Sequence, residues 1–133
     1  MQRVNVIENN NKGMVTSNAV AQLGKSTQIY AGSTYDGTEK TLNQSIRNFR
    51  YILIGLITNN DYDYILMPTD RVQNGTILTR SLFEASTFGQ VTLPFPYQST
   101  VLINFISDTK FKVNANYNNI NWILKVYAIW GIN

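Results

Sequence analysis

The fold class is decided by the stretch TKFKVNANY at residues 109–117. Its apolar and polar residues alternate strictly, so that two sets of side chains fall on opposite faces: Phe111, Val113, Ala115 and Tyr117 on one, and Lys110, Lys112, Asn114 and Asn116 on the other. Because successive side chains of a strand point to opposite faces, this period of two indicates a β-strand with one buried and one solvated face.

Similar apolar runs recur at short intervals on both sides of this stretch. We expect further strands at residues 28–31, 51–58, 64–67, 81–85, 91–93, 100–106 and 122–132. Asn74-Gly75 predicts a two-residue hairpin with a type I′ turn, since both central positions of that turn require positive φ. Short strands at this spacing are typical of an antiparallel sandwich or a barrel, and we predict a mainly β chain with an antiparallel β-sandwich head.

Three of these segments are apolar on both faces, at residues 51–57, 101–106 and 122–130. In a chain with too little helix to cover a second face, another subunit covers it most simply. Charged residues make up only 14% of the chain, and obligate interfaces are poor in charge. We therefore expect an oligomer. The alternative is a doubly layered core in which loops such as residues 93–97 fold over the outer face.

Residues 1–13 carry an apolar strip, Val4, Val6 and Ile7, followed by a run rich in asparagine that ends in Gly13. Asparagine and glycine favour turns and exposed backbone. We predict an attachment arm and hinge in which the strip docks on another protein. The alternative is a frayed terminus, which is common in the first few residues of a domain.

Residues 14–25 have the signals of a short helix, with capping residues at 16 and 17 and a glycine at 24 that can end it. A helix this short is marginal in water, so Met14, Val20 and Leu23 need a partner surface. That surface belongs either to another copy of the chain or to the same domain. We predict a trimerisation neck here and a head domain over residues 26–133.

Composition argues against several classes of function. The chain has no cysteine and no histidine, which excludes disulfides, Cys/His zinc sites and histidine-dependent triads. Its 11 basic and 8 acidic residues are interspersed, without the basic stripe of a nucleic-acid binder. We find neither an apolar run as long as a membrane span nor the apolar core of a signal peptide, and expect neither membrane insertion nor export by that route.

The remaining acid-base groups do not form a recognisable catalytic pair. No pattern places any two carboxylates across a cleft, so we expect a non-enzymatic protein without cofactor or metal. The acidic and asparagine-rich residues 59–63 lack the glycine and terminal glutamate of an EF-hand loop, and we predict a strand turn there instead.

Aromatic and amide side chains suggest contacts with sugars. Aromatic faces stack on the apolar side of a pyranose ring, while amides bond its hydroxyl groups. Residues of these types near predicted turns are the candidates for glycan or receptor contact: Tyr62, Tyr64, Tyr97, Asn118 and Asn119. Trp122 and Trp130 share one face of the last predicted strand, and we assign them to the core or an interface.

Residues 13–23, GMVTSNAVAQL, resemble a segment that recurs just before the terminal domain of bacteriophage tail fibres and head fibres. The rest of the chain is similar to the C-terminal knob of those fibres, from residues 35–37 through the aromatic strand at 49–54 to the last strand at 124–132. The resemblance implies a parallel homotrimer, with the short helices at the three-fold axis. It also implies a virion protein, assembled in the host cytoplasm, that displays its heads to a host polysaccharide or protein.

The short N-terminal region, which has no long shaft, favours a small appendage seated on another phage structural protein. Three weak arms held in one trimer raise the effective concentration of one another. Two alternatives remain: a capsid head-fibre or decoration protein with a mainly structural role, and a monomeric carbohydrate-binding module.

Overall fold

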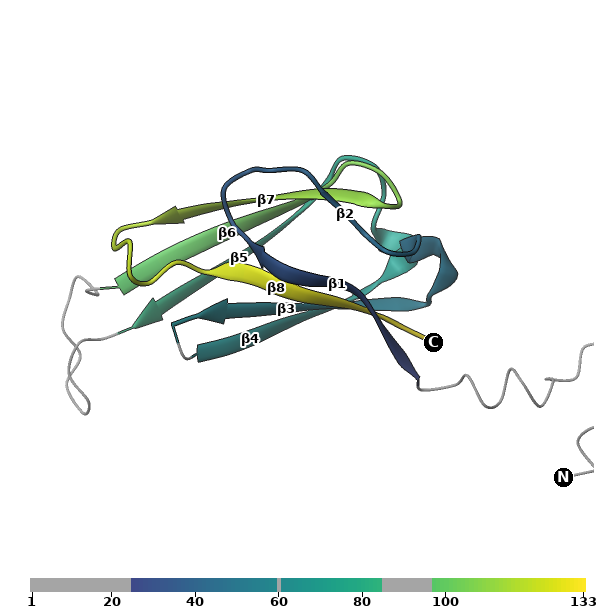
Figure 1. The fold of residues 1–133 in the computed structure, drawn as a ribbon, viewed down its shortest axis with the longest axis horizontal. Helices are drawn as coiled ribbons and strands as arrows, with labels where there is room; N and C mark the ends of the chain where they lie inside the picture. The colour runs from purple at the N-terminus through teal and green to yellow at the C-terminus, as the bar shows by residue number, and fades with distance from the viewer. Residues whose placement is uncertain (1–24, 60, 85–96) are drawn as a thin grey trace, which may run out of the picture.

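The structure is a computed structural model that describes residues 25–59, 61–84 and 97–133. Two antiparallel sheets of four strands pack face to face (Figure 1). We call the sheet with strand order β1-β8-β3-β4 sheet A, and the sheet with order β2-β7-β6-β5 sheet B. The prediction of a mainly β chain built as an antiparallel sandwich is confirmed for these residues.

Each sheet mixes strands from distant parts of the chain. Sheet A contains β1 (Ser26–Thr34), β3 (Tyr51–Thr58), β4 (Asp61–Pro68) and β8 (Lys125–Ile132). Sheet B contains β2 (Lys40–Thr41), β5 (Thr76–Glu84), β6 (Tyr97–Phe105) and β7 (Lys110–Tyr117). Two short 3₁₀ turns, η1 (Ile46–Asn48) and η2 (Thr69–Arg71), lie in the connections.

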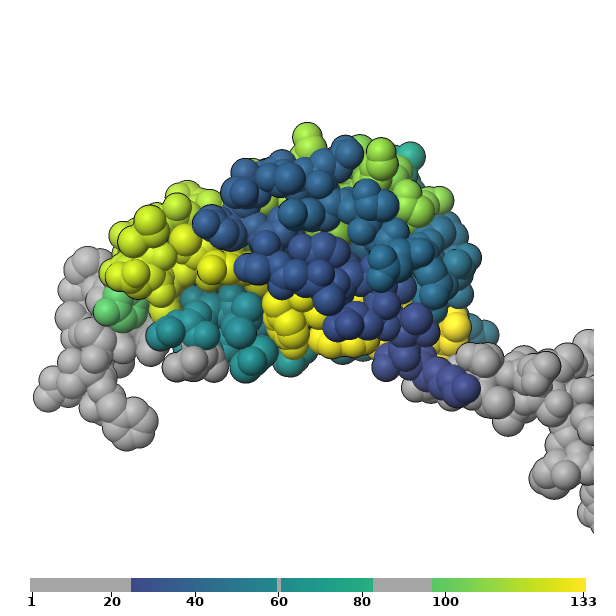
Figure 2. Space-filling model, viewed as in Figure 1, coloured from purple at the N-terminus to yellow at the C-terminus, as the bar shows by residue number. Residues whose placement is uncertain are grey.

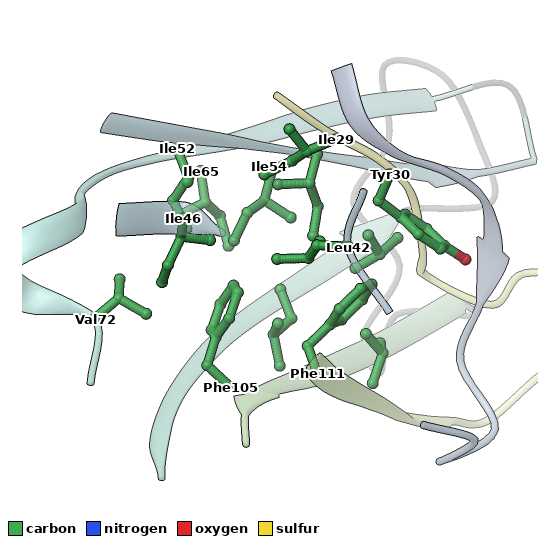
Figure 3. Packing of buried hydrophobic residues seen from close by; sticks show 14 of the residues in the cluster. Ile29, Tyr30, Leu42, Ile46, Ile52, Ile54, Ile65, Val72, Phe105 and Phe111 are labelled. Atoms are coloured by element: carbon green, nitrogen blue, oxygen red, sulfur yellow. The ribbon is translucent and has the colours of Figure 1, made fainter. Parts of the chain in front are cut away.

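The core lies between the sheets, where isoleucines of sheet A face phenylalanines of sheet B (Figure 3). Ile29, Ile52 and Ile54 are fully buried on one side, and Phe105 and Phe111 on the other. Burial of one such side chain contributes about 1.5–3 kcal/mol to stability. Residues from the connections between strands complete the cluster: Leu42, Ile46 and Val72.

The alternation in β7 is confirmed for most of its length. Phe111 and Val113 are fully buried, while Lys110 and Lys112 are exposed. Tyr117 departs from the prediction, because 38% of its surface is accessible. It is the last residue of β7 and lies at the margin of the core.

The Asn74-Gly75 turn exists, but the prediction of a type I′ hairpin is wrong. The Thr76 N–H donates to the Gln73 carbonyl over 2.9 Å, and only Gly75 of the two central residues has positive φ, at 85°. That pattern is typical of a type II turn. Pro68 ends β4 in sheet A, and the chain then crosses through η2 to begin β5 in sheet B.

The last strand begins later than predicted, at Lys125 rather than at residue 122. Trp122, Ile123 and Leu124 are buried without belonging to a ladder. The Leu124 N–H donates to the Ser99 hydroxyl oxygen over 2.9 Å instead of to a neighbouring strand. The strand predicted at 91–93 lies outside the described residues, as do the arm and nearly all of the neck.

The sandwich has two distinct ends (Figure 1). At the end that we call the base, the Asn133 N–H donates to the Lys25 carbonyl, so both ends of the head domain lie together. The Arg47 guanidinium closes the base by donating to the carbonyls of Thr69 and Val72 and pairing with Asp108. The opposite end, the tip, holds the β3–β4 turn, the start of β6 and residues 118–124.

A close contact between Gly131 and the ring of Phe49 predicts the effect of one substitution. A Cβ added at Gly131 would overlap that ring. We expect Gly131→Ala to lower the free energy of unfolding by about 1–3 kcal/mol through overpacking, although glycine-to-alanine changes in strands usually stabilise. Chemical denaturation measures the change. In a Phe49→Ala background the same substitution should cost much less, and an equal cost in both backgrounds would contradict the contact.

Candidate functional site

Within the part of the chain that the structure describes, the outer face of sheet A is apolar and leaves several large side chains exposed. Tyr51, Leu53 and Ile57 of β3 lie on the face opposite the core. Their cross-strand neighbours on β4 include Leu66 and Tyr62, whose surfaces are 60% and 58% accessible. The predicted apolar second face of residues 51–57 is therefore confirmed in the structure of the single chain.

The outer face of sheet B is different in character. On β6, Leu102 is exposed and Asn104 is half-buried on the outward side. Their neighbours on β7 are Asn114 and Lys112. The expectation that residues 101–106 are apolar on both faces therefore holds only in part, because Asn104 lies on the outward side with Leu102.

Four rings gather on the outer face of sheet A, and we call them the aromatic cluster: Tyr62, Tyr64, Tyr127 and Trp130. Ring centroids of Tyr62 and Tyr127 are 5.5 Å apart, and those of Tyr127 and Trp130 are 5.9 Å apart, both edge to face. This arrangement is favourable for aromatic pairs. The cluster lies over Gly55, where an added Cβ would come within 2.7 Å of the Tyr127 ring and 3.0 Å of the Trp130 ring.

The hydroxyl groups of Tyr64 and Tyr127 share a hydrogen bond of 2.8 Å. Desolvation within the cluster, followed by this hydrogen bond, raises the pKa of Tyr127 to about 12. The phenol is therefore neutral at any physiological pH. The cluster presents aromatic surface without charge, which suits stacking rather than acid-base chemistry.

The predicted sugar-contact residues fall into two groups. Tyr62 and Tyr64 belong to the aromatic cluster on sheet A, together with Trp130, which had been assigned to the core or an interface. Tyr97 instead begins β6 of sheet B, where its ring stacks on that of Trp122 with centroids 6.1 Å apart.

Asn118 and Asn119 also lie at the tip, but their side chains shape the loop that follows β7. The Asn118 side-chain oxygen accepts the Gln98 N–H over 2.9 Å, and that of Asn119 accepts the Asn121 N–H over 2.9 Å. Each of these oxygens accepts one backbone N–H, and the amide N–H groups of both side chains are further donors, so the sugar-contact role of Asn118 and Asn119 stays a prediction.

A pocket of about 310 Å³ opens at the tip beside the aromatic cluster, and we call it the tip pocket. Its lining comes from β1, β3, β8 and the loop before β8, and includes Ser33, Ile57, Asn59, Asn121, Ile123 and Lys125. None of these residues was predicted as a site from the sequence. The available signal was Lys125, the one charged residue in the apolar stretch 122–130.

Among residues 25–59, 61–84 and 97–133, no group of three acidic side chains is placed to hold a metal ion. The same part of the chain contains no helix long and apolar enough to cross a membrane. Comparison with models of known protein families gives no match, and no curated protein sequence matches the chain.

The shared hydroxyl bond predicts how Tyr127 titrates. The unfolded chain loses this proton near the ordinary pKa of 10 and the folded chain near 12, so this group's stabilisation is complete below pH 10 and is lost as the pH rises toward 12. We expect Tyr64→Phe to lower the Tyr127 pKa by removing the bond. The ultraviolet absorbance of tyrosinate, followed during a pH titration, measures it. Tyr51→Phe is the control. If the tyrosine titration step at the highest pH does not move in Tyr64→Phe, the hydrogen bond does not raise the pKa of Tyr127.

Proposed function

We propose that the chain is a non-enzymatic bacteriophage virion fibre protein, a homotrimer that is anchored by its N-terminus and binds the host surface through its β heads. The observation that carries the proposal is the exposed apolar face that sheet A has among the described residues, which extends from Tyr51 near the base to Tyr62 at the tip. Exposed apolar faces of this kind mark interaction sites in soluble proteins. The resemblance of residues 13–23 to fibre proteins supports the class.

The arrangement of base and tip suits this role. The described head begins with Lys25 and β1 at the base (Figure 1). An anchor that precedes Lys25 therefore leaves the tip as the part of the head farthest from the particle. The tip carries Tyr62, the Asn59 turn and the tip pocket, which are the features best suited to contact with a host surface.

The base half of the same face suits contact between copies. Tyr51, Leu53 and Leu66 form an aliphatic and aromatic surface there. The predicted neck helix ends directly before β1, so association of Met14, Val20 and Leu23 at a three-fold axis would bring the bases of three heads together. Burial of this surface between copies would remove its contact with water and stabilise the trimer.

Host adsorption of particles that lack the chain tests the adhesive role. We expect a large loss of adsorption, and purified protein added in excess should compete with intact particles for the host surface. The whole chain must be deleted in this experiment. A truncation of residues 97–133 would remove the core strands β6, β7 and β8 and unfold the head. Normal adsorption of particles without the chain would contradict adhesion and favour the structural decoration role.

The neck predicts a second outcome. In a trimer, Leu23→Asp would place three unpaired buried charges at one axis, which is strongly destabilising for the assembly. We expect conversion from trimer to monomer, measured by light scattering coupled to size exclusion. Gln22→Asp adds the same charge next to Leu23 and should leave the trimer intact. An unchanged trimer in Leu23→Asp would remove this helix from the interface.

The arm predicts a third outcome. Deletion of residues 1–12 removes Val4, Val6 and Ile7 without touching the described head. We expect a folded trimer that no longer joins the particle, as measured by the amount of chain on purified virions. Incorporation of the truncated chain at normal occupancy would show that the anchor lies elsewhere.

A further inference from the structure

We infer that the tip pocket binds a saccharide that carries a carboxylate, such as a uronic or sialic acid unit. The inference rests on the proposed adhesive function and specifies its ligand. The loop of residues 118–124 meets the end of β3 and Asn59 at this pocket, and Figure 2 shows the yellow-green part of the chain against the teal region of β3 and β4. Its volume of about 310 Å³ is at the low end of the roughly 300–1,000 Å³ range of small-molecule sites, which suits a single sugar unit.

Charge is the first argument for an anionic ligand. Of the described residues that line the pocket, Lys125 alone carries a charge. Its ammonium group lies 5.1 Å from the centroid of the Tyr35 ring, a cation–π contact that positions it. The ion pairs in the described part of the chain involve Arg47, Arg80 and Lys110 but not Lys125. A ligand carboxylate can therefore form an ion pair with this half-buried ammonium group.

The other polar groups suit hydroxyl groups. Ser33 supplies a hydroxyl, and Asn59 and Asn121 supply amides, each of which both donates and accepts hydrogen bonds. Among the described residues that line the pocket there is no carboxylate to repel an anion. A cluster of neutral donors and acceptors around one ammonium group matches a sugar acid better than a phosphate, which needs several cations or backbone N–H groups.

Apolar surface beside these groups suits the ring of a sugar. Ile57 and Ile123 line the pocket, and Ile120, 74% accessible, also contributes. Tyr62 is the cross-strand neighbour of Ile57 and connects the pocket to the aromatic cluster. A polysaccharide can thus place its acidic unit in the pocket and an adjacent ring against Tyr62, where it stacks on aromatic surface.

Titration of the full chain by nuclear magnetic resonance tests the inference directly. The probes are glucuronic acid and N-acetylneuraminic acid, with glucose as the neutral sugar and acetate as the carboxylate without a sugar. We expect an acidic sugar to shift the amide signals of Ser33, Asn59 and Asn121, to bind more tightly than glucose or acetate, and to weaken as salt is added.

Variants of Lys125 separate charge from shape. Lys125→Gln should lower the affinity for the acidic sugar roughly tenfold or more, as expected for loss of one charge-assisted hydrogen bond. Lys125→Arg keeps the charge and should keep the preference for acidic over neutral sugar. The matched control is Lys112→Gln, which removes one charge from an exposed position on β7 and should leave binding unchanged.

The inference would be overturned by equal affinity for glucuronic acid and glucose, by binding of acetate as tight as that of both acidic sugars, or by unchanged affinity in a folded Lys125→Gln variant. Failure of both acidic sugars to bind would also overturn it. If particles without the chain still fail to adsorb in that case, the adhesive function stands and its ligand is of another kind.

Discussion

The two central strands of sheet A, β3 and β8, carry apolar side chains on both faces, and the rest of the structure depends on this constraint. On one face, Ile52, Ile54 and Ile129 meet the phenylalanines of sheet B and form the core. The opposite face cannot be solvated favourably over its whole area. The same strands therefore hold the sandwich together and create the exposed apolar surface on which the proposed assembly rests.

Two glycines let aromatic rings pack on both sides of these strands. Gly131 on β8 leaves room for Phe49 on the core side, and Gly55 on β3 leaves room for Tyr127 and Trp130 on the outer side. A β-carbon at either position would push a ring away from the sheet. The aromatic cluster and the core thus both depend on a glycine at which a ring packs directly on the backbone.

Patterns within single segments predicted the strands well, because alternation in β7 and apolarity in β3 are local properties of the chain. The order of strands depends on pairing between distant segments, such as β1 with β8, which no local pattern encodes. The turn at Asn74-Gly75 was misassigned for a related reason. Its residues favour positive φ, but whether the chain then returns along the same sheet depends on the pairing of β5, which lies in sheet B while β4 lies in sheet A.

The tip pocket was beyond reach of the same reasoning, because its lining residues come from three separated segments, around Ser33, Asn59 and residues 120–125. Tyr62 and Tyr64 are candidates because they lie near a predicted turn, and they share a face because residues two apart on a strand point the same way. Asn118 and Asn119 were assigned by type alone, and their bonds to Gln98 and Asn121 show how often asparagine near a turn serves the backbone.

The mass of the purified full chain in solution, measured by light scattering coupled to size exclusion at several concentrations, tests most directly whether the outer face of sheet A and the neck unite copies of this protein. We expect a mass near that of three chains that does not fall on dilution. A mass near that of one chain at every concentration would contradict self-assembly of the free protein.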